Sequence, residues 1–378
     1  MTKFKTMSFT YVFSLTNTIF YFKINIMNNT QFNFKKLPRF KQIIPICFAT
    51  DDNYIPFLAV AIASLLDNAA KDKFYKIYVL TTELKQENID SILKLKTPNS
   101  SIRFISLAKE LDKIQSMFHL RDYYSKESYY RIFIPNIFPE YSKVLYLDCD
   151  ITVTGDISKL YNTQIHGYYV GAIVEEVMLT YDVFGNYTEK VDGINRKHYF
   201  NSGVLLINCH RWRRRMVAEQ FVDLLGRYKF RVVQDEDYLN VICKDNVKWL
   251  DLVWNKTAYK NDDFRDRNLN LIHWKINWRP WKYKNVLYEE NFWKYAKMTD
   301  FYDKLIEMRD SRTDEQKKQD DVMFENLKQM AENESNDPNN FANTIGKEKV
   351  SKKFWKAVLK FIKFRKLINI RMFRKTLS

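Results

Sequence analysis

The chain has 378 residues, of which 46% are hydrophobic and 16% aromatic. This composition excludes a largely disordered protein and allows one large domain with an appendage, or two domains. The net charge of +16 lies at the ends: residues 1–41 carry +7 and residues 347–378 carry +11, which leaves −2 for residues 42–346. A nearly neutral body argues against a nucleic-acid groove, and the basic ends favour an anionic lipid surface.

Residues 1–41 are interpreted as an N-terminal extension outside the ordered body. Lys3 and Lys5 precede an apolar run from Phe9 to Phe22, which superficially resembles a signal peptide. Polar residues interrupt the run and no small-residue cleavage site follows it. The run is also too polar to predict a transmembrane helix. A targeting role and an upstream extension, with the functional chain starting near Met27, both remain open.

Strand and helix patterns alternate through the body of the chain. Strands are predicted at 43–49, 75–81, 102–107, 144–147, 171–174, 203–208 and 271–273, with helices around 58–65, at 83–96, at 210–228 and from Asp235. The repeat of about 25–30 residues per unit indicates an α/β fold with a parallel sheet and crossover helices.

After the body, residues 286–346 are predicted to form a helical, polar spacer, and residues 347–378 a basic tail. In the spacer, the composition after Arg309 shifts to polar residues, so this part is expected to be partly helical or disordered. In the tail, Phe354, Val358 and Phe361 fall on one side of a helix and lysines take the rest. This is the profile of an interfacial membrane helix. A helix docked on its own body is the alternative.

The four cysteines form no C-x-x-C pair, and most of them occupy apolar surroundings. We therefore expect buried free thiols in a reducing cytoplasm, with neither zinc nor disulfides. Combined with the basic tail, this predicts a cytoplasmic protein held peripherally at the inner face of the cell membrane.

Two aspartates follow the predicted strand at 144–147. Because strand side chains alternate between faces, Asp148 and Asp150 can converge on one ion only where the strand turns into a loop. Their hard oxygens suit Mg²⁺ or Mn²⁺, and such an ion suits a diphosphate. Strand ends are also where open α/β sheets bind ligands. Two alternatives remain: the aspartates cap the strand end, or the spacing is chance, since Asp235-Glu236-Asp237 repeats it.

Further polar segments lie at predicted strand ends or helix starts. They are Phe48–Tyr54, Tyr129–Arg131, Leu145–Asp150, Phe200–Asn208 with Trp212, Gln234–Asn240 and His273–Trp281. In order and spacing, this set resembles the family-8 retaining glycosyltransferases, which include bacterial lipopolysaccharide galactosyl- and glucosyltransferases. The resemblance covers about residues 43–285. It implies that residues 42–285 form a GT-A type catalytic domain, a single nucleotide-binding domain with a Rossmann-like mixed sheet, followed by the C-terminal helical basic tail.

The resemblance implies a metal site made of Asp148, Asp150 and His273. The usual ion is Mn²⁺ rather than Mg²⁺, and imidazole beside two carboxylates also tolerates Mn²⁺ better. Arg279 is expected to grip the diphosphate through its fork of donors. The family usually has Lys at the position of Arg279 and Gly at the position of Ile276.

Asp51, Asn53 and Tyr54 follow the first strand, where the resemblance places the nucleotide. Tyr54 would stack on uracil, and Asp51 and Asn53 would bond the base or ribose. The alternative is an ordinary helix N-terminus with Asp52 as its cap.

Arg131, Asn201 and Asp235 match family positions that hold the hydroxyls of the donor sugar, and Gly203 would let the backbone approach closely. Glu236 stands where many family members carry Gln, next to the reacting carbon. Glu236 and Asp235 are the candidate catalytic residues. Three roles stay open for Glu236: nucleophile in a double displacement, stabiliser of an oxocarbenium-like species, or substrate positioning.

The implied function is Mn²⁺-dependent transfer of galactose or glucose from a UDP-sugar to a saccharide acceptor, with retention of configuration. The acceptor would be a lipopolysaccharide, another cell-surface glycan or a glycolipid, and its pocket would come from variable loops such as residues 175–199. The alternatives are another metal-dependent nucleotide transferase, such as a nucleotidyltransferase, and an inactive membrane-bound relative.

Overall fold

The computed structural model describes residues 40–108, 126–258 and 268–347, together with three short strands nearer the N-terminus. Those strands are β1 (Thr10–Leu15) and β2 (Thr18–Lys23), which pair with each other, and β3 (Asn25–Met27). The predicted basic helix beyond residue 347 lies outside the described residues.

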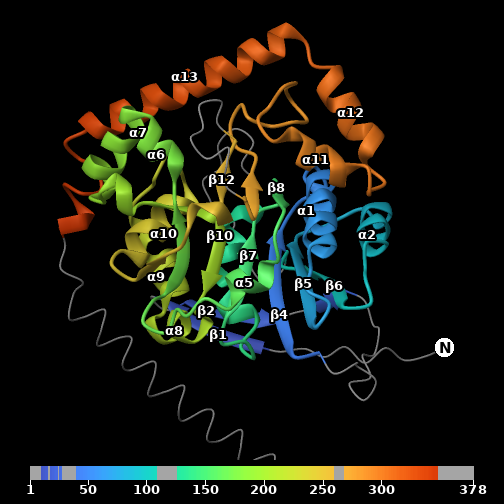
Figure 1. The fold of residues 1–378 in the computed structure, drawn as a ribbon. Coiled ribbons are helices and arrows are strands. Elements are labelled where there is room, and N and C mark those ends of the chain that lie inside the picture. Colours follow the sequence, from blue (N-terminus) through green and yellow to red (C-terminus); the bar gives the residue numbers. More distant parts are fainter. Residues whose placement is uncertain are drawn as a thin grey trace, which may run out of the picture.

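The body is built on a mixed sheet with the order β11-β9-β10-β7-β4-β5-β6-β3 (Figure 1). Its strands in chain order after β3 are β4 (Gln42–Ala49), β5 (Lys73–Thr81), β6 (Ser100–Ser106), β7 (Val144–Leu147), β9 (Val170–Val174), β10 (Phe200–Ile207) and β11 (Val247–Trp249). Strands β7, β4, β5 and β6 are parallel, whereas β10 runs antiparallel to both β7 and β9. The predicted α/β fold with a mixed sheet is confirmed.

Hydrophobic cores lie on both faces of this sheet because side chains alternate along each strand. In β4, Ile44, Ile46 and Phe48 pack with helix α1 (Ile55–Asp67), whereas Cys47 belongs to the core on the opposite face. The first face also receives α2 (Gln86–Leu93), through Ile89 and Ile92.

The opposite face is covered by α8 (Cys209–Arg215), α9 (Val217–Arg227) and α10 (Asp235–Cys243). The prediction of one helix over 210–228 is wrong, since the chain breaks between α8 and α9 at Met216. Its φ of 56° is left-handed, and a left-handed residue ends an α-helix. The four cysteines are free and buried, as expected.

Short helices and helical turns lie between the strands and after α13. They are a 3-10 helix (Lys126–Phe133), α4 (Ile134–Ile137), α5 (Ile157–Tyr161), α6 (Glu176–Thr180), α7 (Asp182–Tyr187), a π-helical turn (Thr188–Asp192), and 3-10 turns at Arg196–His198, Leu252–Trp254 and Ile345–Lys347. A second, small sheet contains β8 (Ile151–Val153), β12 (Lys256–Thr257) and β13 (Leu271–His273).

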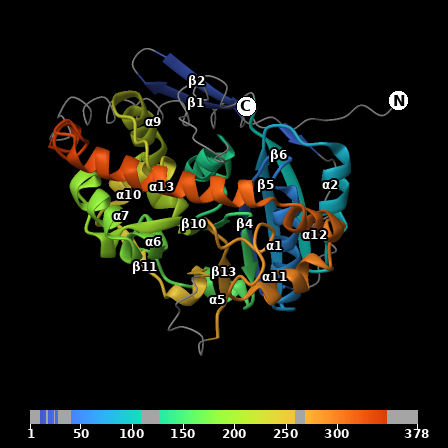
Figure 2. The same ribbon diagram turned by 90° about the horizontal axis from the view of Figure 1, so that it is seen from above.

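Three helices follow the sheet: α11 (Glu289–Ala296), α12 (Tyr302–Asp310) and α13 (Asp314–Asn336). A capping box between Thr313 and Gln316 starts α13. The helix then crosses the top of the molecule, from α12 on one side to α7 on the other (Figures 1 and 2). Within the described residues, no helix combines the length and apolar character needed to span a membrane.

Candidate active site

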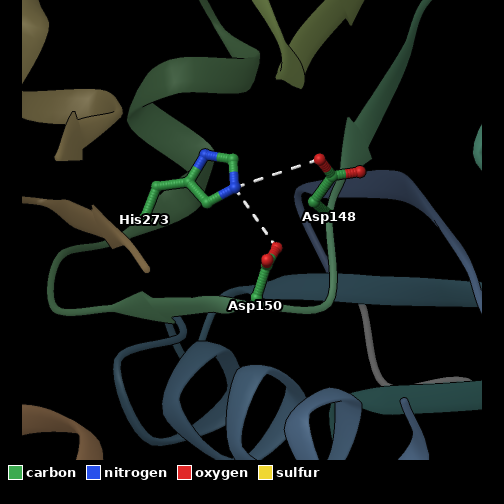
Figure 3. Close-up of side chains that lie close together, drawn as sticks. All are labelled: Asp148, Asp150 and His273. Carbon is green, nitrogen blue, oxygen red and sulfur yellow. Dashed lines mark hydrogen bonds and ion pairs between the residues drawn. The ribbon is translucent and has the colours of Figure 1, made fainter. Parts of the chain in front are cut away.

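The Asp148-Cys149-Asp150 segment joins the main sheet to the small sheet. It follows β7 and precedes β8, so the chain turns between the two aspartates and their carboxylates can converge. His273 Nε2 lies 3.2 Å from Asp150 Oδ1 and 3.9 Å from Asp148 Oδ2 (Figure 3). One ligand atom from each residue falls within 4.8 Å of the others. Two carboxylates and one imidazole in this arrangement fit a divalent transition ion.

Strand pairing explains how His273 reaches the aspartates from more than 100 residues away in the sequence. In the small sheet, β13 runs antiparallel to β8 and His273 pairs with Ile151. The next residue, Trp274, donates its backbone N–H to the carbonyl oxygen of Asp150 at 2.9 Å. The main sheet positions the first aspartate, since Asp148 donates its backbone N–H to the carbonyl oxygen of Gly203 at 2.8 Å.

A hydrogen bond behind His273 fixes the orientation of its ring. Its Nδ1 lies 2.9 Å from Asn255 Oδ1, an amide oxygen that can accept a ring proton, while Nε2 faces Asp150. Burial raises the pKa of Asp150, but the hydrogen bond and charge of His273, together with the charge of Arg279, lower it below its ordinary value. Asn255 is a positioning residue that sequence reasoning missed, because it precedes a two-residue strand that has no visible pattern.

Arg131 connects the metal ligands to the start of α10. Its guanidinium lies 3.1 Å from Asp148 Oδ1 and 3.2 Å from Asp235 Oδ2. It also donates to the backbone and hydroxyl oxygens of Ser202, at 2.6 and 2.9 Å. A buried arginine between two carboxylates is rigidly oriented, so this ion pair aligns the sheet edge with α10.

Glu236 is buried at the first turn of α10 and lines the same pocket. Its Oε2 accepts hydrogen bonds from the Ser202 backbone N–H at 2.6 Å, the Ser202 hydroxyl at 2.9 Å and the Asn201 amide at 3.2 Å. Burial, followed by the charge of Glu175, raises the pKa of Glu236 well above its ordinary value. The preceding Gln234 has φ 56° and ψ −116°, a strained backbone at the point where the helix begins.

Glu175, which is buried, and Lys275, which is partly exposed, form an ion pair in this pocket that sequence reasoning did not assign. Lys275 Nζ lies 2.6 and 2.8 Å from the two carboxylate oxygens of Glu175. Asn201 donates to Glu175 Oε2 at 2.5 Å, and its own Oδ1 accepts from Asn255 at 2.8 Å. Glu175 directly follows β9. The rule that pointed to Asp148, namely an acidic residue at the end of a strand, could therefore have found Glu175 as well.

On the nucleotide side, the structure brings Tyr54 to the pocket but not its two predicted partners. Tyr54 lines the pocket, whereas Asp51 and Asn53 are absent from its lining. Asp51 instead accepts the backbone N–H of Tyr54 at 3.0 Å. The alternative with Asp52 as the cap of this helix is wrong, since Asp52 accepts the backbone N–H of Lys85 at 3.1 Å, at the start of α2.

The segment after β13 carries the predicted phosphate-binding residue. Arg279 is buried, lines the pocket and places its guanidinium 3.5 Å from Asp150 Oδ2. In the same segment, Ile276 adopts φ 53°, in the left-handed region that a β-branched residue rarely occupies. The Arg279 guanidinium, which lies beside the candidate metal site, therefore belongs to a segment whose backbone is strained at Ile276.

All of these groups face one pocket at the ends of the parallel strands. Of the predicted site residues, those that line it are Tyr54, Arg131, Asp148, Asp150, Asn201, Asp235, Glu236, His273 and Arg279. Fold and site together define an α/β protein whose strand ends hold a candidate divalent-metal site beside cations that fit a diphosphate.

Comparison with known proteins identifies the family. The model of glycosyl transferase family 8 matches residues 45–285. A putative glycosyltransferase of Haemophilus influenzae is 30% identical over 236 residues, which is 62% of this chain and 70% of that protein. A lipopolysaccharide 1,2-glucosyltransferase of Escherichia coli is 27% identical over 281 residues, covering 66% of this chain and 80% of that protein.

Solved structures agree with this assignment. The galactosyltransferase LgtC, in complex with donor and acceptor sugar analogs, has a TM-score of 0.57 and 26% identity over 68% of this chain and 96% of its own. The bifunctional glycosyltransferase WbbM has a TM-score of 0.62 over 72% of this chain and 52% of its own, at 24% identity, and supports the fold alone. The chain belongs to glycosyl transferase family 8 and is a glycosyltransferase of the GT-A fold. The family implies a nucleotide-sugar donor, a glycan acceptor and a divalent metal.

Proposed function

We propose that this protein transfers galactose or glucose from a UDP-sugar to a saccharide acceptor, with retention of configuration and with Mn²⁺ as its ion. The observation that carries the proposal is the convergence of Asp148, Asp150 and His273 beside Arg279 in one pocket. The mixed nitrogen and oxygen donor set favours Mn²⁺ over Mg²⁺, which prefers oxygen ligands. The imidazole oriented by Asn255 is the arrangement expected of a metal ligand.

In this proposal each part of the pocket has one task in the transfer. The bound ion would neutralise charge on the departing diphosphate. Arg279 would bind phosphate oxygens, and Tyr54 would stack on the uracil. Arg131, Asn201 and Asp235 would hold the sugar hydroxyls. The bond from the anomeric carbon to the diphosphate oxygen breaks, a bond to an acceptor hydroxyl oxygen forms, and the hydroxyl proton leaves with UDP or solvent.

The groups around Glu236 help to choose among the three roles that the sequence left open for it. A nucleophile must be a carboxylate, but burial and the nearby Glu175 charge raise the pKa of Glu236 well above its ordinary value and so disfavour the carboxylate. All three hydrogen-bond donors contact Oε2, so the proton belongs on Oε1. A protonated Glu236 matches the amide of the Gln that many family members carry there. We therefore favour substrate positioning over nucleophilic attack.

The acceptor proposed here is a lipopolysaccharide or another cell-surface glycan or glycolipid. The similarity to a lipopolysaccharide glucosyltransferase supports this class of acceptor. The net charge of +11 over residues 347–378 supports association of the protein with the inner face of the cell membrane, where such acceptors are assembled.

The test is incubation of the purified full-length protein with UDP-galactose and UDP-glucose, with Mn²⁺, Mg²⁺ or a chelator. We expect release of UDP with Mn²⁺ and its loss with chelator or in the Asp150→Asn variant. NMR of the product would show the anomeric configuration of the donor retained. Release of pyrophosphate instead of UDP would favour a nucleotidyltransferase, and failure to bind any UDP-sugar would favour an inactive relative.

A further inference from the structure

The active-site pocket has a second wall that the donor chemistry does not use. Its apolar residues are Val177 and Met178 of α6, Phe184 of α7, Val232 and Val233 before α10, Ile276 after β13, and Leu327 of α13. Helices α6, α7 and α13 lie together in Figures 1 and 2, with α13 passing over α7. The phosphates, sugar hydroxyls and metal need polar partners, so this wall has no task in binding the donor.

Ile276 indicates that the wall is maintained at an energetic cost. Its φ of 53° would be free of strain for glycine, the residue the family usually has there. For isoleucine, this conformation is strained because the Cβ crowds the following carbonyl oxygen. The side chain nevertheless lines the pocket and packs against the same core cluster as Leu327. Strain retained at a ligand pocket points to a function for the side chain that causes it.

Helix α13 is fixed where it contributes to this wall. The Phe324 ring packs against Tyr181 and Phe184, with centroids 5.3 and 5.9 Å apart. Leu327 follows three residues later and therefore lies on the same side of the helix. At the far end of α13, Glu334 pairs with Arg231 at 3.0 Å. The position of Leu327 at the pocket is thus set by packing on either side of it.

We propose that the wall formed by Ile276, Leu327 and the α6–α7 side chains is the acceptor subsite, and that it takes an acceptor with an alkyl or aryl group beside the reacting sugar. This rests on the proposed function. A purely hydrophilic acceptor would place hydroxyls against a wall that offers them no hydrogen bonds. An aglycone of the lipid type is instead stabilised by every methylene group that it buries against the wall. A glycolipid acceptor has this chemistry.

The experiment compares acceptors that differ only in the aglycone. Methyl, octyl and phenyl glycosides of glucose and galactose, below their micelle concentrations, are given to the full-length protein with its UDP-sugar and Mn²⁺. We expect kcat/KM at least tenfold higher for an octyl or phenyl glycoside than for the methyl glycoside. In Leu327→Ala and Ile276→Gly this ratio falls toward one. Val322→Ala is the matched control, since Val322 lies on the same helix but is 56% exposed and outside the pocket.

Equal kcat/KM for methyl, octyl and phenyl glycosides overturns the inference while leaving the proposed function intact. A preference for octyl that survives both Leu327→Ala and Ile276→Gly also overturns it, as does UDP-sugar hydrolysis with no transfer to any glycoside. A protein that binds no UDP-sugar fails at the earlier step and refutes the proposed function and the inference together. Thermal melting confirms that each variant is folded before its ratio is interpreted.

Discussion

Gly203 lies against the candidate metal site, and its lack of a side chain leaves room for Asp148 and His273. A Cβ added there would come within 2.6 Å of Asp148 Oδ2 and closer still to the His273 ring. We therefore expect Gly203→Ala to displace both side chains and to weaken metal binding at least tenfold, because ligand geometry sets affinity. Titration of UDP-sugar turnover with Mn²⁺ measures this.

Gly171→Ala is the control for this substitution, since a Cβ at Gly171 meets only side-chain carbons, at 3.3 Å or more. It should leave the Mn²⁺ dependence unchanged even where it lowers stability. An unchanged Mn²⁺ requirement in Gly203→Ala would place the ion elsewhere.

The raised pKa of Glu236 leads to a prediction about how activity depends on pH. Its raised pKa means that the folded protein keeps this proton above the ordinary range of a glutamate. If the protonated form positions substrate, activity is present below the raised pKa and falls as pH rises through it. Glu236→Gln should keep activity within about tenfold of the wild type at neutral pH and lose this alkaline decline, since the amide carries no titrating proton. Profiles of kcat against pH for both proteins test this.

A loss of several orders of magnitude in Glu236→Gln at neutral pH would contradict positioning and favour a nucleophilic carboxylate. The neighbours that set this pKa are Glu175, Lys275, Asp235 and Ser202. Any shift of the profile in variants of Glu175 should therefore be read as an effect on Glu236.

Among the candidate site residues, the sequence alone pointed to those whose residue type, at the end of a strand, suggests one particular chemical role. The Asp148 and Asp150 pair was found this way, and His273 was found only through the family pattern. It missed Asn255, which orients His273 18 residues later, and Lys275, which pairs with Glu175 100 residues earlier. Amides and lysines occur everywhere on protein surfaces, so no local pattern marks the few that have such partners.

At the scale of elements, the alternation of apolar strands and helices predicted the strands of the sheet, because burial dictates that pattern locally. It did not predict that β10 runs antiparallel to β7 and β9. The helix at 210–228 was predicted without its break, since Met216 is an ordinary helix former and only tertiary packing forces its left-handed φ. The polar composition of residues 309–346 gave no sign that α13 would cross the pocket. Few apolar residues on α13, chiefly Phe324, Leu327 and Met330, pack against the core.

The contacts between α13 and residues 275–283, the segment that carries Arg279, lead to a prediction at the scale of elements. Asp320 on α13 accepts from Lys282 Nζ at 3.1 Å, the Tyr283 hydroxyl at 2.8 Å and the Arg312 guanidinium at 2.8 Å. Asp320→Ala leaves three donors without their acceptor. We expect faster hydrogen exchange in α13 and in residues 275–283, and a severalfold higher KM for the UDP-sugar.

Asp314→Ala is the matched control on the same helix. Asp314 is exposed and pairs with Lys317, one turn along, and such pairs contribute little. Exchange in residues 275–283 that is as slow in Asp320→Ala as in Asp314→Ala would show that α13 does not stabilise this segment.

At the scale of the whole molecule, the positive charge lies in a different part of the chain from the active-site residues. The body that carries the active site is nearly neutral, whereas residues 348–378 alone carry a net charge of +10. Screening limits such charge to about 10 Å at ordinary ionic strength, so a basic tail acts on a surface it touches and leaves a distant pocket unaffected. Membrane association and catalysis should therefore be separable by shortening the chain.

A protein ending at Lys347 should float with vesicles of anionic lipid far less than the full-length protein, while its turnover of UDP-sugar in solution stays within about twofold. Each Lys or Arg near an anionic surface contributes about 1 kcal/mol, so binding of the full chain should weaken steeply as salt is raised. Replacing Phe354 and Phe361 with Ser keeps every charge and removes the apolar face. If the tail inserts as an interfacial helix, this variant should lose binding at high salt first, because only buried apolar area resists screening. Equal flotation of the full-length and shortened proteins would show that the tail does not hold the enzyme at the membrane.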